Sequence, residues 1–146
     1  NLIIKFNKMT KLPKSYKPSE KEKFMNAKMK EYFRLKLIYW KKDLLKESSI
    51  TLINLQKQEN TTKSDFTDRA TEEIERSFEL RTRDRERKLI AKINAALQRI
   101  EDGTYGYCDE TGDPINIKRL DARPIATLSL EAQETHEKKE KIKIKS

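Results

Sequence analysis

Two carboxylates, Asp65 and Asp68, stand three residues apart where a polar stretch gives way to a heavily charged one. Side chains at this spacing share one face of a first helical turn, so the pair predicts an acidic tip where the chain reverses. Two interpretations are open. Acids at a helix start cap backbone amides and suit the helix dipole, or their charge acts on a partner. The residues alone favour capping.

Other residues that could do chemistry are few. His136 is the only histidine and lies in a charged segment, where an exposed side chain without a role is expected. Cys108 is the only cysteine, so it forms no disulfide within the chain, and no histidine base stands near it in the sequence. A glycine-rich phosphate loop is also missing from the sequence. We therefore expect a binding protein and not an enzyme.

The sequence from Cys108 onward has the outline of a zinc knuckle with most of its ligands replaced. Cys108, Thr111 and Gly112 follow the Cys-x-x-Cys-Gly spacing, and Ser129 and Ala132 stand where a second pair would. A structural zinc ion needs four ligands, and only Cys108 is a competent one. We expect neither zinc nor another bound cofactor, and a small end that is packed by aromatic and aliphatic side chains.

The elements that position these residues are predicted to be two long helices. Ser19, with Glu20 and Glu22, has the composition of a helix start. Apolar residues then recur at helical spacing on the outgoing helix: Phe33, Leu37, Trp40, Leu44, Leu52 and Leu55. A second stripe marks the returning helix: Ala70, Ile74, Phe78, Leu89, Ile93, Leu97 and Ile100. Each stripe is typical of one seam of a coiled coil. The polar cluster at 60–64 favours the turn, and Gly103 ends the second helix.

The composition agrees with this arrangement. Of 146 residues, 39% are charged and only 35% are hydrophobic, which suits a hairpin with an apolar seam better than one round core. The predicted fold is mainly α: a long antiparallel two-helix coiled-coil hairpin, a small zinc-finger-like globular end and a C-terminal helix. The expected parts are an irregular basic lead-in at 1–19, the hairpin at 20–102 with its tip near 60–70, the degenerate zinc-finger-like region at 103–129, and a helix with a basic tail at 130–146. The expected core of the small end is Tyr105, Tyr107, Ile115, Ile117, Leu120, Ile125 and Leu128.

The net charge is +9, and its excess lysines lie near both ends of the sequence. Such ends attract polyanions weakly, which is poor evidence for a surface that reads DNA. No apolar run approaches the ~18 residues of a membrane span, and NLIIKF is too short for a signal-peptide core. A single cysteine fits a reducing compartment. We expect a monomeric cytoplasmic protein that starts at Met9, with residues 1–8 as a poorly ordered upstream extension.

Three blocks of the sequence resemble one known family, and they occur in the right order. They read DRATEEIERSFELRTRDRERKLIAKI at 68–93, IEDGTYGYC at 100–108 and KRLDARPIATLSLEAQE at 118–134. These blocks are similar to the DksA family of bacterial RNA polymerase-binding transcription factors, which is related to the TraR/C4-type zinc finger family. The resemblance covers about residues 20–141, most of the chain.

The resemblance implies a regulator whose hairpin enters the secondary channel of RNA polymerase and places its tip near the active site. It implies that open-complex stability is modulated together with the alarmone ppGpp, that ribosomal RNA promoters are repressed and that some amino-acid biosynthesis promoters are activated. The residues that match the family's active tip are Asp65, Asp68 and Ala70. Those that match its ppGpp contacts are Leu89, Lys92 and Arg123, with Arg85 and Arg119 near the polymerase contact.

The chain departs from the family's pattern in two places. The four zinc cysteine positions read Cys108, Thr111, Ser129 and Ala132, so the chain resembles a zinc-less member. A basic position that some members use for ppGpp is Gln133 here.

Two other functions stay open from the sequence. A transcript cleavage or elongation factor resembling the Gre proteins shares an acidic-tipped hairpin, although the blocks after Gly103 argue against it. A basic nucleic-acid-binding protein is the alternative from another class. The uneven lysines and the lack of a reading helix support it poorly, and we expect no sequence-specific DNA binding.

Overall fold

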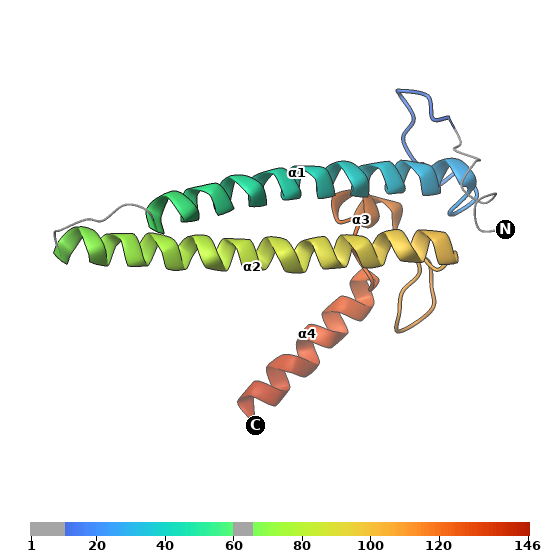
Figure 1. Ribbon diagram of the computed structural model, residues 1–146. Coiled ribbons are helices and arrows are strands. Elements are labelled where there is room, and N and C mark those ends of the chain that lie inside the picture. The colour runs from blue at the N-terminus through green and yellow to red at the C-terminus, as the bar shows by residue number, and fades with distance from the viewer. Residues whose placement is uncertain (1–10, 60–65) are drawn as a thin grey trace. The chain divides into compact units, whose positions relative to one another are not determined.

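The computed structural model describes residues 11–59 and 66–146, and helices dominate it (Figure 1). α1 (Ala27–Glu59) and α2 (Phe66–Asp102) are long, α3 (Ile117–Ala122) is short, and α4 (Leu130–Lys145) follows it. The chain divides into unit 1, which is Asn1–Leu37 with Ala95–Ser146, and unit 2, which is Ile38–Asn94. The mainly helical fold with two long packed helices and a C-terminal helix is confirmed. In the part of the chain that is described, no helix is long and apolar enough to cross a membrane.

α1 begins at Ala27, so the predicted start at Ser19 is wrong. The backbone of Met25 takes a φ of 52°, which is outside the helical region, and the Asn26 side chain accepts a hydrogen bond of 2.8 Å from the Met29 amide. Asn26 therefore caps the helix. Ser19 instead closes a local turn with Glu22, whose amide donates to the Ser19 carbonyl over 3.3 Å. A cap residue type with acids after it is not enough to start a helix when the chain must bend before continuing.

The segment before α1 packs on the loop after α2. Gly106 has a φ of 89°, and a Cβ there would lie 2.9 Å from Cε of Met25. The Phe24 and Tyr107 rings meet edge to face, with 5.3 Å between their centroids. Gly106 is therefore required both by its backbone conformation and by the close approach of Met25.

The core of unit 1 contains most of the residues predicted for the small end. Tyr105, Ile115, Ile117, Leu120 and Ile125 are buried, whereas Tyr107 is 38% exposed and Leu128 is half-buried. The helices add buried side chains that complete this core: Met29, Phe33, Leu37, Ala96 and Ile100. Apolar packing between α1, α2, α3 and the loops on either side of α3 thus holds the globular end.

In unit 2 the outgoing stripe of α1 is only partly as predicted. Leu44 and Leu55 are buried, but Leu52 is 36% exposed. Ser48 and Thr51 are half-buried and occupy the inner positions between Leu44 and Leu55. The inner face of α1 therefore keeps its spacing of three and four residues but includes two polar side chains, which a search for apolar residues alone does not find.

The prediction that the apolar stripe of α2 is buried is wrong for the first half of the helix. Ile74 and Phe78 are 70% and 63% exposed, and Ala70 is also exposed. Ile93 is fully buried, and the seven-residue repeat before it leads to Glu86 and Glu79, of which Glu86 is only 8% exposed. Each of these glutamates has a buried Oε2 without a hydrogen-bond partner among the described residues. The register set by Ile93 places carboxylates inside and turns Ile74 and Phe78 outward.

Candidate functional site

The predicted tip residues are only partly described by the structure. Asp68 lies in the first turn of α2, where its side chain is exposed, and Ala70, two residues further along the helix, is also exposed. Asp65 lies outside the described residues. An exposed carboxylate at a helix start suits the positive end of the dipole, and it is also free to meet a partner. The geometry therefore agrees with both interpretations of Asp68.

Three of the predicted contact residues share one face of α2 in unit 2. Arg85, Leu89 and Lys92 stand at spacings of four and three residues, which places them on one side of the helix. Arg85 and Lys92 are exposed, and Leu89 is half-buried. This face offers two cations beside an apolar side chain, a combination that suits a ligand with phosphates and a flat apolar part.

The other two predicted contact residues belong to α3 and its end, in unit 1. Arg119 is half-buried, and its Nε donates a hydrogen bond of 2.9 Å to the Leu128 carbonyl. Arg123 is exposed and follows the helix as its C-cap, and its amide donates to the Arg119 carbonyl over 2.8 Å. The structure thus brings these two arginines onto one short hydrogen-bonded segment.

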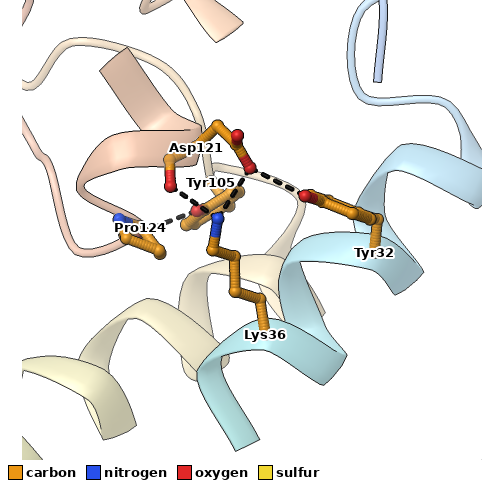
Figure 2. A network of polar contacts seen from close by, with 5 residues as sticks. All are labelled: Tyr32, Lys36, Tyr105, Asp121 and Pro124. Carbon is orange, nitrogen blue, oxygen red and sulfur yellow. Dashed lines mark hydrogen bonds and ion pairs between the residues drawn. The ribbon is translucent and has the colours of Figure 1, made fainter. Parts of the chain in front are cut away.

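A polar network ties the end of α3 to α1 (Figure 2). Lys36 Nζ donates to Oδ1 of Asp121 over 2.7 Å and to the Asp121 carbonyl over 2.6 Å. The Tyr32 hydroxyl donates to the same Oδ1 over 2.8 Å. No local sequence pattern predicts this network, because Asp121 stands 85 residues from Lys36.

The network changes the acidity of its members. The hydrogen bond from Lys36 lowers the pKa of the Asp121 carboxyl, and the bond from Tyr32 adds to this against the opposing effect of burial. Burial and the hydrogen bond to Asp121 raise the pKa of Tyr32 to about 12. Asp121 is therefore ionised and Tyr32 is a protonated donor at neutral pH, which are the states that the hydrogen bonds need.

The backbone just beyond Arg123 is held by a second contact. The buried hydroxyl of Tyr105 donates to the Pro124 carbonyl over 2.7 Å. Burial raises the pKa of Tyr105 well above its usual range, against the opposing effect of the Arg99 charge. Tyr105 is thus a permanent donor, and its ring packs against the Phe33 ring of α1 with 5.6 Å between the centroids.

The predicted zinc positions have other tasks in the structure. The Thr111 hydroxyl accepts from the Asp113 amide over 3.3 Å, and the Ser129 hydroxyl caps α4 by accepting from the Ala132 amide over 3.3 Å. Ala132 is buried, and its methyl side chain has no atom that could ligate a metal ion. Within residues 11–59 and 66–146 there is no group of three or more metal-ligating side chains. This set of side chains does not fit a four-ligand zinc site.

Cys108 itself lies in a cluster of hydrogen-bond donors and is 3% exposed. Burial raises the pKa of its thiol, but hydrogen bonds from the Thr111 side chain and from the backbone at Ser129, Thr111 and Glu110 outweigh this and lower the pKa to about 6. The Cys108 amide also donates to the Asp113 carbonyl over 2.8 Å and closes the loop. Hydrogen bonds therefore gather around the one sulfur of the degenerate knuckle.

The last two residues singled out in the sequence lie on α4. Gln133 donates a hydrogen bond of 2.9 Å to Glu137, and exposed His136 lies 3.6 Å from Glu140. In both contacts the two residues are one helical turn apart on α4, and neither contact involves a ligand. The structure adds nothing to the expectation that His136 has no chemical role.

Comparison with known proteins decides the family. The model of the DnaK suppressor protein DksA N-terminal domain matches residues 29–100, and that of the prokaryotic dksA/traR C4-type zinc finger matches residues 103–138. A Caulobacter vibrioides protein named RNA polymerase-binding transcription factor DksA is 57% identical over 127 residues, which are 87% of this chain and 89% of the relative. The chain belongs to the DksA family. This is a family of transcription factors and not of enzymes.

Other DksA family members support the assignment across most of the chain. Proteins of the same name from Haemophilus influenzae and Escherichia coli K12 are 42% and 41% identical and cover 88% and 86% of this chain, and 88% and 83% of their own lengths. The solved structure of transcription factor DksA2 from Pseudomonas aeruginosa has a TM-score of 0.76 and 38% identity, and the match covers 81% of this chain and 90% of that one. The DksA fold is therefore shared, and the C4 zinc finger part is matched by a sequence with a single cysteine.

Proposed function

We propose that this chain is a transcription factor that binds RNA polymerase directly, without reading DNA sequence. The observation that carries the proposal is the identity of 41% to 57% with relatives named as RNA polymerase-binding transcription factors, over 83% to 89% of their lengths. In this proposal the hairpin enters the secondary channel of the polymerase and alters the stability of open complexes. Ribosomal RNA promoters are repressed, and some amino-acid biosynthesis promoters are activated. The protein acts as a monomer in the cytoplasm.

The tip is the proposed acting part, with Asp68 as its central charge and Asp65 and Ala70 beside it. The exposure of Asp68 supports this role, because its carboxylate is accessible at the start of α2. Small Ala70 is also exposed and would let the helix approach a surface closely.

The decisive experiment changes Asp68 to Asn and measures transcription from a ribosomal promoter in vitro. Asn caps helices about as well as Asp, so a capping role predicts a loss of ~1 kcal/mol at most and normal inhibition. We expect inhibition to be abolished while helicity, melting temperature and polymerase binding are retained. Asp84→Asn is the matched control, since Asp84 is an exposed carboxylate on the same helix, and it should inhibit normally. An Asp68→Asn protein that inhibits at the wild-type concentration would leave only the capping role.

We further propose that ppGpp is the effector, with Lys92 and Arg123 as phosphate donors and Leu89 as an apolar contact. Arg85 and Arg119 are assigned to the neighbouring polymerase contact. The exposure of Lys92 and Arg123 supports this assignment. Gln133, already paired with Glu137, replaces a basic residue and supplies no charge, so the site depends more strongly on Arg123.

Lys92→Ala and Arg123→Ala test the effector site. A hydrogen bond between charged groups contributes about 1.5–3 kcal/mol, so each change should raise the half-maximal ppGpp concentration by about tenfold or more and leave basal inhibition nearly intact. The exposed neighbours Lys88 and Lys118 provide matched Lys→Ala controls. Equal loss of basal inhibition and of the ppGpp response would indicate damaged polymerase binding instead.

Polymerase binding also separates this proposal from the other functions. A pull-down with RNA polymerase should retain the protein, while a gel shift with free duplex DNA should show no sequence preference. A transcript cleavage factor would shorten the RNA in a stalled elongation complex, which we do not expect here.

A further inference from the structure

Arg123 lies between two residues that are each held from another segment of unit 1. Asp121 is bonded to Lys36 and Tyr32 of α1, and the Pro124 carbonyl is bonded to the Tyr105 hydroxyl (Figure 2). Only Ala122 and Arg123 separate these two anchors. The backbone from which the Arg123 side chain projects is therefore fixed on both sides.

The anchor on α1 is itself preorganised. Tyr32 and Lys36 are one helical turn apart, and Lys36 Nζ lies 5.8 Å from the centre of the Tyr32 ring. The ring is held by edge contacts with Tyr16 and Phe33, at centroid distances of 6.1 Å and 5.3 Å. Lys36 also bonds a main-chain carbonyl at the end of α3, where helices leave carbonyls without a partner.

The network is too exposed to contribute much to the stability of the fold. The side chains of Lys36 and Asp121 are 36% and 48% exposed, and ion pairs at such positions stabilise proteins little. Its main effect is on the orientation of α3, because two donors from α1 converge on one carboxylate oxygen of Asp121. Arg119 projects from the same helix and is oriented by the Leu128 carbonyl.

We propose that Tyr32 and Lys36 are positioning residues that hold the end of α3 so that Arg123 presents its guanidinium group to a pyrophosphate-bearing nucleotide. This inference rests on the proposed function, which places such a ligand on Arg123. Tyr32 and Lys36 act through Asp121 and need not touch the ligand. A bidentate phosphate contact depends on the orientation of the guanidinium plane, so a shift at the end of α3 weakens binding even though Arg123 itself remains.

The test compares variants of the full chain with ppGpp as the probe. Lys36→Met keeps the length of the side chain and removes its charge, and Tyr32→Phe keeps the ring and removes the hydroxyl. Lys36→Arg retains a cation and serves as the rescue variant, and Lys28→Met is the control at an exposed lysine of α1. Two readouts are taken: the half-maximal ppGpp concentration for inhibition of a ribosomal promoter, and hydrogen exchange of the Arg123 and Ala126 amides.

We expect Lys36→Met and Tyr32→Phe to raise the half-maximal ppGpp concentration by roughly 3- to 10-fold, the lower part of the range for coupling within one hydrogen-bonded network. Inhibition without ppGpp and the melting temperature should stay near wild type. The two amides should exchange faster, Lys36→Arg should recover most of the response, and Lys28→Met should behave as wild type.

The outcomes separate this inference from the function on which it rests. If Arg123→Ala weakens the ppGpp response but Lys36→Met and Tyr32→Phe do not, the positioning role is wrong and the proposed function stands. If Arg123→Ala has no effect on that response, the proposed effector site fails and the positioning role fails with it. A variant that loses basal inhibition and the ppGpp response equally, or that melts much earlier, shows a purely structural network and also overturns the inference.

Discussion

Replacing Glu86 with leucine should stabilise the protein, although glutamate is a better-hydrated residue on a charged helix. Glu86 is 8% exposed, and its Oε2 is buried without a hydrogen-bond partner in the described parts of the chain. A buried polar atom without a partner costs about 1–3 kcal/mol of folding free energy. Leucine removes that cost and has a similar volume, and the seam already accepts it at Leu44 and Leu55.

The expected gain is therefore about 1–3 kcal/mol in the free energy of unfolding. For a chain of 146 residues this corresponds to a rise in melting temperature of roughly 2–4 °C per kcal/mol. Urea unfolding followed by circular dichroism measures the first quantity, and a thermal melt measures the second. Glu73→Leu is the matched control, since Glu73 is exposed on the same helix and the same change there should stay within about 0.5 kcal/mol.

Glu86→Gln divides the effect into its parts. It removes the charge and keeps a polar group inside the seam, so we expect less stabilisation than leucine gives. A Glu86→Leu protein that unfolds at lower urea than wild type, while Glu73→Leu is neutral, would contradict the expected gain. The carboxylate would then have a stabilising partner in solution.

Three further predictions concern other parts of the chain. Metal analysis should find no stoichiometric zinc, and a chelator should leave the melting temperature unchanged, because among the four knuckle positions only Cys108 has a side chain able to ligate zinc; one zinc per chain would contradict this. The pKa of Cys108 is lowered to about 6 in the folded chain, so its ionisation adds stability that is fully present above the thiol's ordinary pKa of about 8.5 and is lost as pH falls through 6. The melting temperature of wild type minus that of Cys108→Ala should therefore shrink between pH 9 and pH 6 (both approximate), and a pH-independent difference would contradict it. The lowered pKa of Asp121 gives a stability contribution that is present above about pH 4 and is lost in stronger acid, and it is small because both partners are exposed. Lys36→Met should therefore melt near wild type at neutral pH and show a slightly flatter loss of melting temperature below about pH 4.

The local sequence determined the elements and the packing of the small end. Gly103 and the helical spacing were enough to predict two long helices, because hydrogen bonding within a helix depends on neighbouring residues only. The turn predicted at 60–64 lies outside the described residues. The apolar residues after Gly103 predicted most of a buried core, since a short segment between charged helices has few other side chains to bury. That only one of the four predicted knuckle positions holds a cysteine could also be read directly from the sequence.

The tertiary structure decided which face of each helix lies inside. Ile74 and Phe78 have the right spacing for a seam and are nevertheless exposed, because the repeat that ends at Ile93 places Glu79 and Glu86 inward. The start of α1 was likewise set by the bend at Met25 and not by the cap-like residue Ser19. A register is a property of two packed helices, and a single stripe of one helix does not fix it.

The network around Asp121 shows the same limit for the candidate site. Arg119 and Arg123 could be found from their block of sequence, but their supports come from residues far away along the chain, Tyr32, Lys36 and Tyr105. Each of those side chains has an ordinary local context on a charged helix or loop. Their roles arise only when folding brings α1 and the loop after α2 against α3, because hydrogen bonds depend on distance in space and not on distance in sequence.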